Sequence, residues 1–177
     1  MAKNNIGLTV SCIFIVVILF ITVADAQQVT RKFDNFYNTH NTECLSQFII
    51  AGRGGDVTFT KRVSKQFDSQ TYILKFKMKN KEESWHFTYD GIELRIGENK
   101  EIQSLNPNKV DCKFINTQNG YTVHHSWAEI TVRQNIIDLL KTARSAVFKI
   151  TFSDQGECVW EVPWNILRTW QQIIELN

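Results

Sequence analysis

Hydrophobic and polar residues alternate along much of this chain, and a period of two predicts β-strands. The clearest case is residues 71–79, where Tyr72, Leu74, Phe76 and Met78 alternate with mostly basic positions. Similar runs follow at 85–96, 110–115, 121–132 and 146–152. Because one set of alternate positions is apolar and the other largely polar, each strand is expected to bury one face.

Short glycine-containing segments separate these runs and predict turns. They are Gly52–Asp56, Asp90-Gly91, Gly97–Lys100, Asn119-Gly120 and Asp154–Glu157. Asp-Gly and Asn-Gly are the strongest short signals for a hairpin, because both favour the positive φ angles that tight turns need. Successive strands joined in this way normally pair antiparallel, so the pattern predicts a meander.

Two segments change to helical spacing, at 133–143 and at 164–176. In the second, Trp164, Leu167, Trp170 and Ile174 recur every three or four residues, after a proline that suits a first helical turn. We interpret this stripe as a face buried against a sheet, which Trp160 on the preceding strand can meet. A ligand pocket lined by Trp160 and Trp164 is the alternative, since indole rings also bind ligands.

These elements predict an α+β fold. We expect a predominantly antiparallel β meander or sandwich of about seven to nine short strands with two short helices. Residues 27–177 carry no linker composition or repeat, so they are expected to form a single β-rich domain. The polar stretch 27–43 is its lead-in.

The first 26 residues have the pattern of a secretory signal peptide. A single lysine precedes the apolar run 6–23, and Ala24-Asp25-Ala26 provides small residues at the two positions that define a cleavage site. The mature chain would then begin at Gln27 and be exported, to the periplasm or outside the cell. The alternative is an uncleaved anchor, because about 18 apolar residues nearly span a bilayer. In that case membrane contact is expected through residues 6–23 alone.

Three cysteines remain after the signal segment: Cys44, Cys112 and Cys158. Oxidising compartments favour disulfides, and three cysteines always leave one unpaired. We favour a bridge from Cys44 to one of the other two, with the pairing left open. Three buried free thiols are the alternative, because cysteine is often buried.

The net charge of +2 gives little attraction for nucleic acid, and we expect no nucleic-acid partner. Charge is nevertheless concentrated on one predicted strand, where Lys75, Lys77 and Lys79 share a face. These lysines are a candidate binding stripe for an anionic partner. The alternative is a solvated row that protects an edge strand from aggregation.

The richest polar segment is His124–Glu129, yet it contains no catalytic signature. His124 and His125 point to opposite faces of a strand, so they cannot share a metal without a bulge. His125 and Glu129 share a face and, with the distant His86, would form a metal site only in a suitable strand register. We find no metalloprotease, nucleophile-elbow, phosphate-loop or calcium-loop pattern, and expect no cofactor.

From Trp85 onward, the order of elements is a tryptophan-bearing strand, Asp90-Gly91, further strands, a short helix, a final hairpin and a terminal helix. This order resembles small exported bacterial β-rich domains of uncharacterised function. The resemblance covers residues 85–177 and implies an architecture, with no catalytic residues. We therefore expect a non-enzymatic exported domain that binds a protein or another macromolecule. The alternatives are a metal-dependent hydrolase using His86, His125 and Glu129, and a carrier of small apolar ligands.

Overall fold

The computed structural model of the chain describes residues 28–35, 38–81, 85–98 and 102–176. The expected signal segment, residues 1–26, lies outside these residues. Within them, no helix combines the length and the apolar character that a membrane crossing requires.

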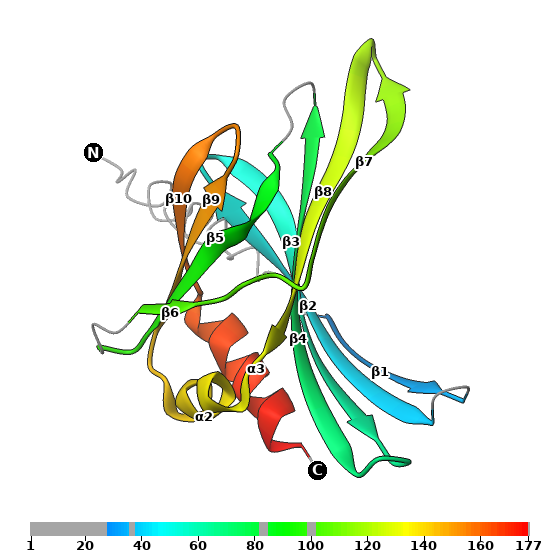
Figure 1. Cartoon of the computed structure of the whole chain (residues 1–177), viewed down its shortest axis with the longest axis vertical. Coiled ribbons are helices and arrows are strands. Elements are labelled where there is room, and N and C mark those ends of the chain that lie inside the picture. The colour runs from blue at the N-terminus through cyan, green and yellow to red at the C-terminus, as the bar shows by residue number, and fades with distance from the viewer. Residues whose placement is uncertain (1–27, 36–37, 82–84, 99–101, 177) are drawn as a thin grey trace, which may run out of the picture.

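The described chain forms two antiparallel sheets and two helices (Figure 1). The larger sheet has the order β1-β2-β3-β4-β8-β7, from Gln28–Asp34, Thr39–Ile50, Arg53–Ser64, Ser69–Lys81, Tyr121–Val132 and Lys109–Gln118. The smaller has the order β10-β9-β5-β6, from Gly156–Glu161, Ala146–Phe152, Phe87–Ile96 and Ile102–Ser104. The helices are α2 (Gln134–Thr142) and α3 (Trp164–Glu175). The predicted α+β class, dominated by antiparallel strands with two helices, is confirmed.

The larger sheet forms one layer and curves around the rest of the molecule. The smaller sheet covers one part of its inner face, and α2 and α3 lie beside that sheet and cover the next part (Figure 1). Helix α3 contacts both β2 and β3, while β10 contacts β2. The ends of the β1–β2 and β3–β4 hairpins extend past the helices, so the inner face of the larger sheet is left open there (Figure 1).

The prediction of a hairpin at Asp90-Gly91 was wrong. Strand β5 continues through both residues, and its pairing with β9 shifts register between Phe87 and Ile92. The dipeptide therefore lies in a β-bulge, which adds residues to one strand without reversing it. Gly91 is needed because a Cβ at this position would lie 2.6 Å from the carbonyl oxygen of Thr151.

The first predicted turn lies slightly earlier than expected. Ala51 and Gly52 have φ angles of 49° and 74° and connect β2 to β3. Positive φ at both central positions is typical of the tight hairpin turn that matches strand twist. Gly54 and Gly55 belong to β3 rather than to the turn. The Asn119-Gly120 hairpin prediction is confirmed, since these residues connect β7 to β8 with φ angles of 52° and 81°.

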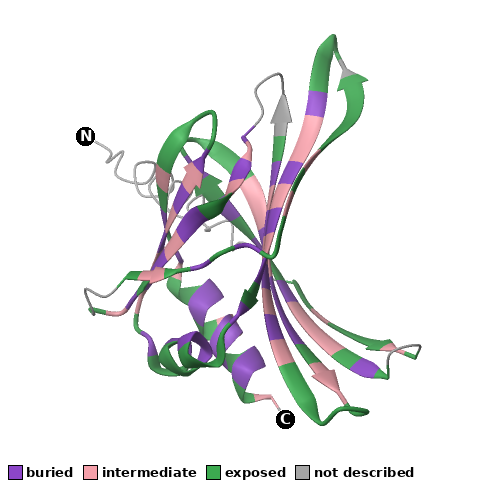
Figure 2. Cartoon of the chain, in the orientation of Figure 1, coloured by how far each residue is buried: buried purple, intermediate pink, exposed green. Residues whose placement is uncertain are grey.

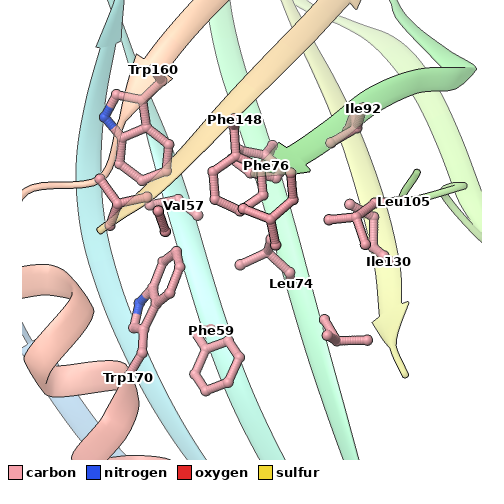
Figure 3. Packing of buried hydrophobic residues seen from close by; sticks show 14 of the residues in the cluster. Val57, Phe59, Leu74, Phe76, Ile92, Leu105, Ile130, Phe148, Trp160 and Trp170 are labelled. Carbon is pink, nitrogen blue, oxygen red and sulfur yellow. The ribbon is translucent and has the colours of Figure 1, made fainter. Parts of the chain in front are cut away.

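The hydrophobic core lies between the two sheets and the helices. Figure 3 shows Phe59 and Phe76 from the larger sheet facing Phe148, Trp160 and Trp170. The Trp170 side chain is 0% exposed, and its ring centroid lies 5.3 Å from that of Phe59. Buried positions gather in the middle of the molecule, whereas the hairpin ends are mostly exposed or half-buried (Figure 2). The core therefore fixes the middle of the curved sheet and leaves its ends accessible.

Replacing Gly55 by alanine is expected to lower the free energy of unfolding by about 1–2 kcal/mol, because overpacking a core distorts it. A Cβ there would lie 2.6 Å from Cζ of Phe48 and 2.7 Å from the carbonyl oxygen of Lys77. The neighbouring Gly54→Ala is the control, since a Cβ at Gly54 meets no heavy atom within 4 Å. Urea unfolding followed by circular dichroism measures both. Equal losses would contradict a contact-specific role for Gly55.

Candidate functional site

The predicted lysine stripe lies on the outer face of the larger sheet. Lys77 stands opposite Asp56 on β3, and Lys75 stands opposite Glu129 on β8. The Lys75 ammonium also lies 5.9 Å from the centre of the Trp127 ring. Carboxylates thus alternate with the lysines across the strands, which weakens the stripe as a continuous positive surface.

His125 and Glu129 lie on this same outer face, and His86 does not join them. His125 stands opposite Lys79, and burial together with the charges of Lys77 and Lys79 lowers the pKa of its imidazole. His86 precedes β5, and its Nδ1 lies 3.5 Å from Oδ2 of Asp154. Across the described ranges, no three His, Cys, Asp or Glu side chains are arranged to hold a metal ion. The structure therefore does not bring the three candidate ligands together.

The two tryptophans proposed as pocket residues have different environments. Trp160 is 5% exposed and packs between Phe148 and Trp170, with ring centroids 5.7 Å and 6.3 Å away. Trp164, in the first turn of α3, is 54% exposed and lies under Arg168. The expectation that Trp164 shares the buried stripe was wrong. Ile166 and Leu167 in the same turn of α3 are fully buried, whereas the Trp164 ring is exposed and lies beside Arg168. Trp160 and Trp164 therefore do not line a common pocket.

The expected disulfide from Cys44 is also corrected, since Cys44, Cys112 and Cys158 are all free thiols. Cys44 is buried on β2, where its sulfur lies 3.4 Å from the hydroxyl of Ser46. Cys112 lies on β7 at the opposite edge of the same sheet, and Cys158 lies on β10 in the other sheet. Burial raises the pKa of all three thiols, so none is activated as a nucleophile.

A basic hollow lies on the open inner face of the larger sheet, beside the C-terminal end of α3. Its volume is about 430 Å³. The register of the strands brings its lining residues together. Arg31 on β1 stands opposite Thr42 on β2, which stands opposite Lys61 on β3. Two positions further along the same strands, Phe33, His40 and Val63 stand opposite one another in the same way. The full lining is Arg31, Lys32, Phe33, His40, Asn41, Thr42, Lys61, Val63, Lys65 and Leu176.

The charged side chains that line this basic hollow are all positive. It is lined by four side chains that are cationic at neutral pH, together with His40, and no described carboxylate is among its lining residues. Lys32 forms an ion pair with Glu43 at 3.1 Å, so part of its charge is compensated. Arg31 and Lys65 form no ion pair within the described residues, and both are exposed. An anion entering the basic hollow would therefore meet uncompensated positive charge.

Lys61 is the most buried of the cationic residues that line the basic hollow. It is 6% exposed, and its ammonium donates to the carbonyl oxygens of Ile174, at 3.1 Å, and of Leu176. These carbonyls belong to the end of α3, where a helix leaves its acceptors unpaired and carries partial negative charge. Burial lowers the pKa of Lys61, and the charge of Lys141 lowers it further. Lys61 thus attaches the C-terminal end of α3 to the sheet.

Apolar surface accompanies the charge. Phe33 is 49% exposed, and its ring centroid lies 4.5 Å from that of His40. A second hollow of about 470 Å³ adjoins the first between β1 and α3, with Arg31 and Leu176 in both linings. Val29, which is 47% exposed, lines this second hollow. Glu175 also lines the second hollow, so the first hollow is the better place for an anionic group. The two hollows together suit a ligand with an anionic group for the first and apolar groups for both.

Comparison with protein-family models, with curated proteins and with solved structures gives no match to this chain. The candidate site therefore depends on the chemistry and the geometry of its own residues.

Sequence reasoning missed the basic hollow, although one signal for it is present. In residues 28–34, Val29, Arg31 and Phe33 alternate with polar residues, which is a strand pattern with a basic residue on its apolar face. This run lies within the polar stretch 27–43, for which the sequence analysis predicts no strand or helix. Lys61, which lines the same hollow, gives no such signal in the sequence. It lies near Arg31 only because of the register of β1, β2 and β3.

Proposed function

We propose that this protein is a non-enzymatic binding domain, acting outside the cytoplasm, that holds an acidic segment of a protein partner in the basic hollow. The observation that carries the proposal is the one-sided lining, in which Arg31, Lys61 and Lys65 lie together without a described carboxylate. Export is part of the proposal and follows from the signal-peptide pattern of residues 1–26.

Electrostatic attraction explains why the partner is expected to be acidic. Opposite potentials on two surfaces increase the rate of encounter and exclude partners of like charge. Several cations on one concave surface act together, because the low dielectric of the protein wall concentrates their field. Aspartate and glutamate side chains are the usual anionic groups of a protein partner, and arginine binds carboxylates with two parallel hydrogen bonds.

The apolar part of the basic hollow favours a protein segment over an inorganic anion. Phe33, Val63 and Leu176 contribute to the same lining as the cations. A half-exposed phenylalanine gains hydrophobic energy only if an apolar group covers it. A small ion would leave this surface in water, whereas a polypeptide can place an acidic and an apolar side chain in one hollow.

Capture of the tagged full-length protein's partners from the extracytoplasmic fraction of its source tests this proposal. The double variant Arg31→Glu with Lys65→Glu is expected to reduce recovery of an acidic partner by about tenfold or more, because two attractions become repulsions. Both residues are exposed, so the fold is expected to persist. Quantitative mass spectrometry of the captured proteins measures the ratio.

The matched control is Lys75→Glu with Lys79→Glu, which reverses the same number of charges on the outer face. Its partner recovery is expected to match that of the unchanged protein. Loss of the partner with this control, and retention with the hollow variant, would assign binding to the lysine stripe instead. Equal recovery with all three proteins would contradict the basic hollow as the binding site.

A further inference from the structure

The first strand of the larger sheet lies at its edge. In the strand order, β1 pairs with β2 on one side, and no described strand pairs with its other side. An edge strand presents a row of unpaired N–H and C=O groups, which is a template for another strand. Both hollows adjoin this strand, since Val29 lines one, Phe33 lines the other and Arg31 lines both.

We propose that the partner's acidic segment binds in extended form along β1 and becomes a seventh strand of the larger sheet. Its acidic residue would stand opposite Arg31, with apolar residues two positions away on each side, opposite Val29 and Phe33. This inference rests on the proposed function and adds a binding mode and a sequence pattern to it. Main-chain hydrogen bonds would supply affinity, while alternate side chains would supply specificity.

Strand geometry gives this pattern its spacing. Residues two apart on a strand share a face and lie about 6.6–6.8 Å apart. Side chains directly opposite on paired strands have Cβ atoms about 4.5–5.5 Å apart, within reach of a long guanidinium group. A carboxylate opposite Arg31 would therefore enter the region where the two hollows meet. The flanking positions would cover the half-exposed Val29 and Phe33 side chains.

The other edge of the same sheet is less suited to this role. Strand β7 shifts register against β8 between Phe114 and Asn116, whereas β1 keeps one register with β2 over all seven of its residues. A bulge disturbs the regular spacing of edge hydrogen-bonding groups and discourages pairing. The β7 edge also alternates Lys109, Asp111 and Lys113, which gives no consistent attraction for an acidic segment.

A blocked peptide as long as β1, seven residues, tests the proposal against the full-length protein. Its inner-face positions are valine, glutamate and valine, and its other positions are threonine. We expect saturable binding in fluorescence anisotropy, weakened about tenfold when glutamine replaces the glutamate and similarly by Arg31→Gln. Lys113→Gln on the opposite edge is the control and is expected to leave binding unchanged.

Two N-methylated forms of this peptide separate strand addition from simple attraction. One form is methylated at odd positions and the other at even positions, so only one of them loses the N–H groups that face β1. We expect one form to lose binding by at least about tenfold and the other to bind like the parent peptide. This asymmetry is the signature of a paired strand.

Equal binding of the two methylated forms, with binding still dependent on Arg31, would overturn strand addition and leave the proposed function intact. A parent peptide that does not bind at millimolar concentration would also overturn the inference. The capture experiment decides the proposed function separately, since it depends on charge reversal and not on the backbone of the partner.

Discussion

Replacing Trp170 by alanine is expected to lower the free energy of unfolding by about 3–5 kcal/mol. The indole is fully buried, and its ring centroid lies 5.3 Å from Phe59, 6.3 Å from Trp160 and 6.4 Å from Phe148. These neighbours belong to β3, β10 and β9, so Trp170 packs where both sheets meet α3. Its removal opens a cavity that rigid strands on two sides cannot close.

Trp164→Ala is the matched control for this prediction, because it removes the same side chain from the same helix. Trp164 is 54% exposed and contacts Arg168, whose guanidinium carbon lies 5.6 Å from the ring centre. Losing this exposed contact is expected to cost less than about 1 kcal/mol. Urea unfolding followed by far-ultraviolet circular dichroism avoids reporting through the deleted indoles. Similar losses for the two variants would contradict the assignment of Trp170 to the core.

These two tryptophans also show what helical spacing can and cannot predict. Positions 164, 167, 170 and 174 recur every three or four residues, and this spacing predicts that both indoles lie against the core. Intervals of three nevertheless drift around a helix, because three residues turn the chain by only about 300°. Trp164 consequently lies about 120° around α3 from Trp170. It is exposed, although Ile166 and Leu167 in the same turn are fully buried.

Most of the strands could be predicted from the sequence, but one irregularity within them could not. Alternation identified most of the strands correctly, because burial of one face imposes a period of two. The bulge at Asp90-Gly91 was not predictable. An Asp-Gly dipeptide occurs both in hairpin turns, where the chain reverses direction, and in bulges, where another strand comes close to the glycine. A hairpin would require the two halves of residues 87–96 to pair with each other, whereas both halves pair with β9.

The candidate site depends most on tertiary structure and was the least predictable part. Arg31 and Lys61 are brought together by strand register, and Lys61 binds the carbonyl of Ile174, 113 residues away in the chain. Local patterns contain no information on such distant contacts. The lysines that did form a visible pattern, Lys75, Lys77 and Lys79, lie beside carboxylates that only the fold reveals.

Replacing Gln171 by leucine is expected to lower the free energy of unfolding by about 2–3 kcal/mol. Gln171 is buried on α3, and its Nε2 donates to the carbonyl oxygens of Leu140 and Ala143, both at 2.9 Å. These carbonyls lie at the end of α2, where a helix has acceptors without helical partners. Leucine has a similar size but no donor, so the substitution removes the hydrogen bonds and keeps most of the packing.

The neighbouring Gln172→Leu separates this role from a general effect of an apolar residue on α3. Gln172 is exposed, and its substitution is expected to change stability by less than about 0.5 kcal/mol. Thermal and urea unfolding of the two variants measure the difference. A Gln171→Leu protein as stable as the original would mean that another donor, such as water, satisfies the end of α2. A loss confined to Gln171 would instead establish that α3 holds α2 in place by hydrogen bonds, as Lys61 on β3 holds α3.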